Sequence, residues 1–423
     1  MFFGEDFRKN TQEKGGSLAM KYHQRWVYGV TGFLILVFLG VIYAWSIFIQ
    51  PLEQEFGWLR SQTSSIFSIS MVFFCVGNLA AGVIMPRFGP RVGIFLAAAT
   101  ICVGFMASSF TFALPMIFIA YGVLCGFAVG VGANIVLTVS LSWFANQPGI
   151  ASGALLMGFG FGSMVLGPIV TWMLSFLNWR MTFRVLSIVF FILLCIGGVL
   201  LVNPPESEAK KDSGKQGTGG ARDYTTKEML GSAVFKIGFL WLVLLSSGGL
   251  ALIGNAVPAA LDVLAGKMGT AEATIAATSA MGMISLFNGC GRFGSGMIWD
   301  KKGLVATLFS VTSVYIAAMM ILAFATYSRS FPLLVAGFIV LGTAYGGTIS
   351  FGSAMTRGLF GQKHYSMNYA CMTCNMILAA LLGPPMSGYL RTSTGTYLYS
   401  YLVFMGMGVV GLLLSALMRK QRA

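Results

Sequence analysis

The stretch FNGCGRFGSGMIWDKKG, residues 287–303, decides the fold because it places a charge inside an apolar run. The residues before it, from Ala276 to Leu286, are apolar or small, and Arg292 lies before the charged cluster at 300–302. An arginine within a membrane-spanning helix costs about 2.5–3.5 kcal/mol on insertion scales. The question that this stretch raises is what compensates the charge.

The composition is that of a membrane protein. Of 423 residues, 56% are hydrophobic and 9% charged, and the mean hydropathy is +0.80, whereas a soluble domain carries about 25% charged residues. A spanning helix needs about 20 apolar residues, which leaves room for about twelve spans. A membrane barrel would alternate polar and apolar residues, and TGFLILVFLGVIYAWSIFI (31–49) does not alternate.

The apolar runs predict an all-α membrane protein with twelve transmembrane helices in two pseudo-symmetric six-helix bundles. The first run lacks a small-residue cleavage site after it, so we expect a retained span rather than a signal peptide. The predicted spans are 27–50, 62–85, 92–111, 113–143, 149–175, 182–203, 235–264, 272–299, 304–325, 331–357, 364–390 and 396–418.

The charge distribution predicts the orientation. Twenty of the 27 basic residues fall in the two tails and in alternate loops, and six fall in the opposite loops. Basic residues favour the cytoplasmic side, so both tails, 1–26 and 419–423, are predicted to be cytoplasmic, in a cell inner membrane. The net charge of +14 is thereby explained by topology, and no nucleic-acid partner is expected.

The chain repeats itself on either side of a polar segment. NPPESEAKKDSGKQGTGGARDYTTKEM (203–229) is typical of a solvated linker and divides the chain into bundles at 27–203 and 234–418, with the linker at 204–233. GVIMPRFGPR (82–91) matches GMIWDKKG (296–303) at an offset of 214 residues between Gly82 and Gly296. LGPI (166–169) matches LGPP (382–385) at an offset of 216 between their prolines. Such parallel repeats place a binding site at their interface near mid-membrane.

These features resemble the major facilitator superfamily. The loops after spans two and eight carry its Gly-xxx-acid-basic-x-Gly pattern, although Pro86 replaces the acid in the first copy while Asp300 keeps it in the second. The resemblance implies conformational roles for Arg87, Arg91, Asp300 and Lys301. GVIYAWSIFIQPLEQEFGW (40–58), WFANQPGIASG (143–153) and NWRMTF (178–183) are similar to the branch that contains oxalate–formate antiporters and monocarboxylate transporters.

Arg292 is the main candidate for substrate binding. Asn288 lies four residues earlier and shares its helix face, and small residues around them let a neighbouring helix approach. The predicted spans contain no acid at mid-depth, and the guanidinium fork matches a carboxylate. The resemblance implies that this arginine binds the substrate carboxylate. The alternative is a structural arginine, bonded to backbone carbonyls or to Asp262.

Other polar residues in the spans are further candidates, with helix–helix packing as the alternative. Span eleven lacks the lysine that oxalate exchangers carry, which favours a substrate with one carboxylate. Asp262 is the candidate for proton coupling. The remaining substrate-binding candidates are Tyr345, Asn375, Cys371, Tyr43 and Tyr121.

The function that follows is secondary transport of small monocarboxylates, such as lactate, pyruvate or formate, by alternating access. Proton coupling and anion exchange both stay open, and an oxalate–formate type antiporter is the alternative. We find no paired carboxylates, histidine-rich metal set or nucleophile with a base, so neither an enzyme nor a cofactor or metal is expected. A sensor without transport is a distant alternative. We expect a monomer whose partners are its anion, the lipid bilayer and, under symport, protons.

Overall fold

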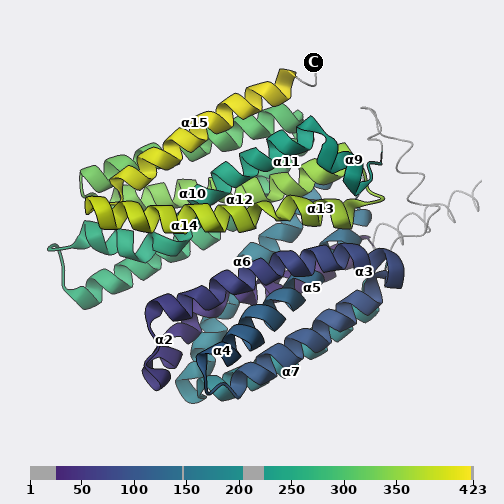
Figure 1. Cartoon of the computed structure of the whole chain (residues 1–423), viewed down its shortest axis with the longest axis horizontal. Helices are drawn as coiled ribbons and strands as arrows, with labels where there is room; N and C mark the ends of the chain where they lie inside the picture. The colour runs from purple at the N-terminus through teal and green to yellow at the C-terminus, as the bar shows by residue number, and fades with distance from the viewer. Residues whose placement is uncertain (1–24, 145–146, 203–222, 421–423) are drawn as a thin grey trace, which may run out of the picture.

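The computed structural model describes residues 25–144, 147–202 and 223–420, apart from some side chains within them. Every regular element in these ranges is a helix (Figure 1). The predicted tail at 1–26 and the predicted linker at 204–233 lie for the most part outside the described residues, and so does the end of the tail at 419–423. The domain boundaries stay predictions.

The first half begins with a helix over residues 25–39. It continues through a 3₁₀ turn, η1 (Gly40–Ala44), into α2 (Trp45–Phe56). The remaining elements of this half are α3 (Arg60–Ser109), α4 (Leu114–Ile117), the π-helical η2 (Phe118–Cys125), α5 (Gly126–Ser142), α6 (Pro148–Phe176) and α7 (Trp179–Leu200).

The second half begins with the short α9 (Thr226–Gly231). Its long helices are α10 (Ala233–Leu264), α11 (Thr270–Tyr327), α12 (Phe331–Phe360), α13 (Tyr365–Thr373), α14 (Asn375–Thr394) and α15 (Leu398–Lys420). The α13–α14 pair forms one span that is interrupted at Cys374.

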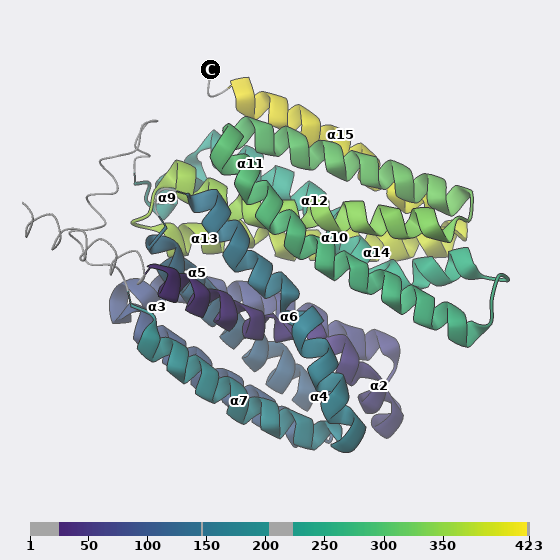
Figure 2. The same cartoon turned by 180° about the vertical axis from the view of Figure 1, so that it is seen from behind.

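Two glycines divide the longest helices. Ten helices among the described residues are long and apolar enough to cross a membrane, but two of these spans have 45 and 53 residues. At about 1.5 Å of rise per residue, a straight helix of either length would far exceed a hydrocarbon core of about 30 Å. Gly89 (φ 79°) and Gly303 (φ 78°) break α3 and α11 in the left-handed region, and Figure 2 shows α11 turning back on itself. The twelve predicted spans are thus confirmed.

Local signals explain where several spans begin. Proline stands in the first turn of α6 and α12, where its missing N–H has no partner to lose. The side chain of Asn178 accepts from the N–H of Met181 at the start of α7, and that of Ser232 accepts from the N–H of Phe235 at the start of α10. These caps satisfy backbone donors that the helix leaves open.

Each half has its own apolar core. One core comprises buried residues between Ile35 and Leu201, and the other comprises buried residues between Met229 and Met418. In the first half α3 packs against α5 and α7, and in the second α11 packs against α12 and α15. Tyr365 and Tyr369 of α13 belong to the first core, so the second half reaches into the first through this helix.

Candidate substrate site between the halves

Arg292 is buried at the boundary between the two halves. Its side chain is on α11 and is 2% exposed. Nε donates to Oδ1 of Asn288 at 2.9 Å, and Nη1 donates to the backbone oxygen of Leu156, on α6, at 2.7 Å. Both acceptors are neutral. Among the described residues no carboxylate pairs with this guanidinium, and three of its five N–H groups have no acceptor there.

Glycines let α6 approach this close. A Cβ atom on Gly153 would stand 2.6 Å from the carbonyl oxygen of Arg292, and one on Gly160 would stand 3.3 Å from its Nε and Cζ. Gly289 makes room for the ring of Phe161, which would lie 2.3 Å from an added Cβ. The guanidinium therefore lies against bare backbone of the opposite half.

The other side of the arginine is held by α12. The hydroxyl of Ser350 donates to the carbonyl oxygen of Arg292 at 2.6 Å and lies 3.1 Å from Oγ of Ser295. A Cβ on Gly346 would stand 1.9 Å from the carbonyl oxygen of Asn288. Close contact and hydroxyl bonds thus fix the backbone that carries the site. Ser295 and Ser350 were not predicted as site residues, because a serine within a span does not by itself indicate a function.

Asp300 joins the halves nearer to the Gly303 turn. Its Oδ1 accepts from the N–H of Gly149 at 2.9 Å, and its Oδ2 accepts from the N–H of Ile150 at 2.7 Å. These are the first free donors of α6, where the helix dipole favours a negative charge. The other predicted conformational residues, Arg87, Arg91 and Lys301, are exposed.

A second junction between the halves is formed by α3 and α5 with α13. Gly82 of α3 approaches Met367 of α13, whose Cα would lie 2.8 Å from an added Cβ. The amide of Asn134, on α5, donates to the backbone oxygen of Ser366 at 3.0 Å, and the Ser366 hydroxyl donates back to its Oδ1 at 2.7 Å. We call the end of the molecule that holds both junctions and the turns at Gly89 and Gly303 the contact end.

Asp262 is engaged elsewhere. Its carboxylate accepts from Nε and Nη2 of Arg391 at 2.6 and 3.0 Å, near the end of α10 that is remote from the contact end. Arg292 stands 22 residues beyond the start of α11, which is about 33 Å of helix rise. The predicted role of Asp262 in proton coupling therefore has no support in this geometry, and it does not supply the counter-charge considered for Arg292.

The first half has a comparable ion pair at the same remote end. Glu55 accepts from Nη1 of Arg180 at 2.5 Å and from Nε1 of Trp179 at 2.6 Å. Partial burial raises the pKa of Glu55, but the bonds from Arg180 and Trp179 outweigh it and hold the pKa below its ordinary value. Each of the two ion pairs lies within a single half, so neither joins the halves.

The weaker candidates are spread over the molecule. Tyr345 is 3% exposed and packs on Gly249. It directly precedes Gly346, which contacts the backbone of Asn288. Tyr121 belongs to the aromatic core of the first half, 4.3 Å from the ring of Trp45. Asn375 donates to the backbone oxygen of Met372 at 2.6 Å, at the α13–α14 break. Cys371 packs against the second core, and the side chain of Tyr43 is outside the described residues. Their substrate-binding roles stay predictions.

The structure adds a second buried arginine, at the last residue of the predicted span 331–357. Arg357, in the last turn of α12, is 6% exposed. Its Nη2 donates to Oε1 of Gln362 at 3.0 Å, while its Nη1 is buried without a partner among the described residues. It stands seven residues beyond Ser350, about 10 Å along the helix, toward the contact end.

The family can now be stated. The sequence pattern of the Major Facilitator Superfamily matches residues 30–350. The chain belongs to this superfamily. It is an integral membrane transporter and not an enzyme. Its resemblance to the superfamily, and to the branch anticipated from the motifs, is confirmed.

Relatives of this superfamily protein are distant but match over most of its length. The oxalate:formate antiporter of Oxalobacter formigenes is 24% identical over 379 residues, which cover 88% of this chain and 86% of that one. Monocarboxylate transporter 2 of Mesocricetus auratus is 23% identical over 399 residues, covering 89% and 80%. Among solved structures, the proton:xylose symporter XylE superposes with a TM-score of 0.67 at 14% identity, covering 93% and 95%. The last likeness confirms the fold.

Proposed function

We propose that this transporter carries small monocarboxylates by alternating access and that Arg292 binds the carboxylate. The observation that supports this most is a guanidinium that is 2% exposed and bonded only to neutral acceptors among the described residues. A buried arginine without a counter-charge is costly. A carboxylate that binds its free N–H groups would remove that cost and gain charge-assisted hydrogen bonds.

One carboxylate suits the site better than two. The described part of α13 and α14 up to Pro385 contains no lysine or arginine. The nearest buried cation toward the contact end, Arg357, is about 10 Å of helix rise beyond Ser350, which is too far for both carboxylates of a compact diacid. Formate, lactate and pyruvate each present a single group for the Arg292 fork.

The same charge balance favours exchange over net uptake. An empty carrier must change conformation with a buried positive charge at the boundary of its halves. A bound anion neutralises that charge, so the loaded carrier changes conformation faster. Proton symport would need a carboxylate beside Arg292 to cover it on the empty return, and Asp262 is paired with Arg391 instead. We infer that one anion is exchanged for another.

The basic residues support an orientation. Arg87, Arg91, Lys301 and Lys302 are exposed at the turns of the contact end, and basic residues favour the cytoplasm. We propose that the contact end and both termini face the cytoplasm of a cell whose inner membrane holds the protein. The structure then corresponds to a carrier whose halves touch on the cytoplasmic side.

The test is counterflow in proteoliposomes. Uptake of labelled formate, L-lactate, pyruvate and oxalate is measured with and without the same anion inside. We expect internal anion to accelerate uptake of the monocarboxylates. Arg292→Lys keeps the charge but loses the fork, so its uptake should fall at least about tenfold, and Arg292→Ala should abolish it. Arg419→Lys, at an exposed position on α15, is the matched control.

Each part of the proposal can fail separately. Unchanged uptake by Arg292→Ala would overturn the binding role of the arginine. Oxalate carried as well as formate would move the substrate class to dicarboxylates. Uptake that is driven by a proton gradient and needs no internal anion would overturn exchange.

A further inference from the structure

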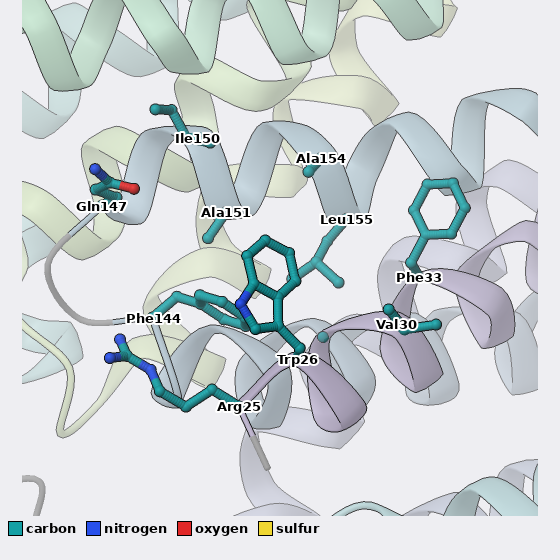
Figure 3. A pocket seen from close by; sticks show the side chains of 11 residues that line it. Arg25, Trp26, Val30, Phe33, Phe144, Gln147, Ile150, Ala151, Ala154 and Leu155 are labelled. Carbon is teal, nitrogen blue, oxygen red and sulfur yellow. The ribbon is translucent and has the colours of Figure 1, made fainter. Parts of the chain in front are cut away.

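A crevice with a volume of about 430 Å³ lies between the first helix and the start of α6 (Figure 3). Residues 25–33 form one wall, and Phe144 with residues 147–155 forms the other. Arg292 is not among the lining residues. The crevice is therefore distinct from the substrate site, and nothing in the proposed transport function uses it.

The two ends of the crevice differ in chemistry. At one end the Nε of Arg25 donates to the backbone oxygen of Trp143 at 2.7 Å, and its guanidinium carbon is 5.6 Å from the ring centroid of Phe144. These contacts fix the guanidinium but leave its Nη1 and Nη2 groups without a bond to the described residues. The other end is apolar, and Figure 3 shows Val30, Phe33 and Leu155 there. The described residues that line the crevice include no acid.

The polar end lies near the start of two spans. Arg25 lies two residues before the first predicted span, 27–50, and the span of α6 begins at Pro148. Trp26 follows Arg25 and is 54% exposed, and tryptophan is enriched at membrane interfaces. The apolar end then extends inward along both helices, toward the hydrocarbon. Basic pockets between spanning helices on the cytoplasmic side suit acidic lipid headgroups.

We propose that this crevice binds an acidic phospholipid, with the headgroup phosphate on Arg25 and an acyl chain along Val30, Phe33 and Leu155. The charge complementarity is one-sided, because Arg25 supplies a cation and no acid among the described lining residues opposes it. A soluble anion would use the guanidinium but not the apolar wall. A zwitterionic lipid would use the wall but bring its own cation against Arg25.

The crevice adjoins the junction between the halves. The side chain of Ile150 lines it, and the N–H of the same residue donates to Oδ2 of Asp300 at 2.7 Å. A lipid in the crevice would therefore touch the turn of α6 that the second half holds. The site is thus placed to respond to the conformational change as well as to the membrane.

The experiment counts lipids that stay bound. The full chain is purified in detergent from vesicles of equal parts phosphatidylglycerol and phosphatidylcholine with identical acyl chains, and retained lipid is measured by native mass spectrometry. We expect one phosphatidylglycerol to be retained in preference. Arg25→Gln should lower its occupancy by about fivefold, the effect of one basic residue near the surface. Arg419→Gln, an exposed cation on α15, should not.

A second variant tests the apolar end. Ala154→Phe fills the crevice next to Leu155 and should release the lipid while Arg25 stays in place. Equal retention of the two lipids by the natural protein, or full retention of phosphatidylglycerol by Arg25→Gln, would overturn the proposal. A truncation of residues 2–20 that raised lipid occupancy severalfold would also overturn it, because the crevice would then belong to the chain's own tail. Transport measured in parallel tells failure of this site from failure of the substrate site.

Discussion

The carboxylate of Asp300, near the middle of the second half, caps a helix of the first half by accepting from the N–H of Gly149 at 2.9 Å. A helix start has several backbone donors that its own turns cannot satisfy. Here the acceptor comes from the opposite half of the molecule, so the cap exists only while the halves touch at the contact end. We therefore expect it to stabilise the conformation in which the halves touch at this end.

Replacing Asp300 should loosen the first turn of α6. Loss of an N-cap costs about 1 kcal/mol, so in Asp300→Ala the amides of Gly149 and Ile150 should exchange hydrogen for deuterium about fivefold faster. Mass spectrometry of the peptide that covers residues 147–155 measures this rate. Lys301→Ala, at the exposed neighbouring position, should leave the rate unchanged. The same acceleration in both variants would show that the cap does not hold the turn.

Gly160→Ala should leave the protein folded but should impair substrate binding. An added Cβ would lie 3.3 Å from Nε and Cζ of Arg292 and 3.5 Å from Oδ1 of Asn288, so it would shift the guanidinium by a few tenths of an ångström. We expect Gly160→Ala to raise the KM for carboxylate uptake by about tenfold, because misplacing a binding group by a small distance is costly.

Gly167 supplies the control for this prediction. It lies on the same helix, and its added Cβ would meet only Cδ1 of Ile47 at 3.6 Å, an ordinary contact. Gly167→Ala should transport with an unchanged KM. If Gly160→Ala behaved in the same way, the substrate would not depend on the position of the Arg292 guanidinium.

The sequence predicted the spans because their signals are local. The apolar runs are visible in the sequence alone, and so is the repeat that places Gly89 and Gly303 at the same offset of 214 residues. Arg292 and Asn288 were found for the same reason, since they share a face of one helix. The structure shows a hydrogen bond between them, while their role in binding stays a prediction.

The contacts that the sequence did not predict form only where helices pack against one another. Nothing near Leu156 marks its carbonyl as the partner of an arginine 136 residues away. Asp262 was considered as a partner of Arg292 because it is an acid inside a predicted span, whereas the fold brings it to Arg391. Arg357 stands at the end of a predicted span, where a basic residue is usually solvated, and only tertiary packing buries it.

The two glycines at the turns should be intolerant of any side chain. Gly303 has φ 78° and ψ −171°, and Gly89 has φ 79° and ψ 169°. This backbone region is essentially restricted to glycine, and a residue with a Cβ there costs about 1–3 kcal/mol. Gly303→Ala and Gly89→Ala should each lower the melting temperature in detergent by a few degrees. Gly294→Ala, in a helical position with open space around it, should be neutral or slightly stabilising. Equal melting temperatures for all three variants would contradict this account of the turns.

Asp262→Asn should separate stability from proton coupling. The carboxylate is bonded to Arg391 at the remote end, and both side chains are more than one-third exposed, so the pair contributes at most about 1 kcal/mol. We expect a small loss of thermal stability and no change in the dependence of uptake on external pH. Uptake followed between acidic and neutral pH checks this, with Arg391→Gln as the matched loss of the same pair. A pH dependence lost in Asp262→Asn but kept in Arg391→Gln would restore Asp262 as a proton site.

Both copies of the repeat contain the glycine, but only the second contains the acid. The two junctions at the contact end therefore differ in chemistry. Gly82 and Gly296 both admit a helix of the opposite half, but the first is followed by Pro86 and the second by Asp300. The α3–α13 junction is therefore held by neutral contacts, whereas the α11–α6 junction also depends on a charge that dissolved ions screen. Rising ionic strength should therefore weaken the α11–α6 junction and leave the α3–α13 junction unchanged. The two halves should then separate first at α6 and rotate about the α3–α13 junction.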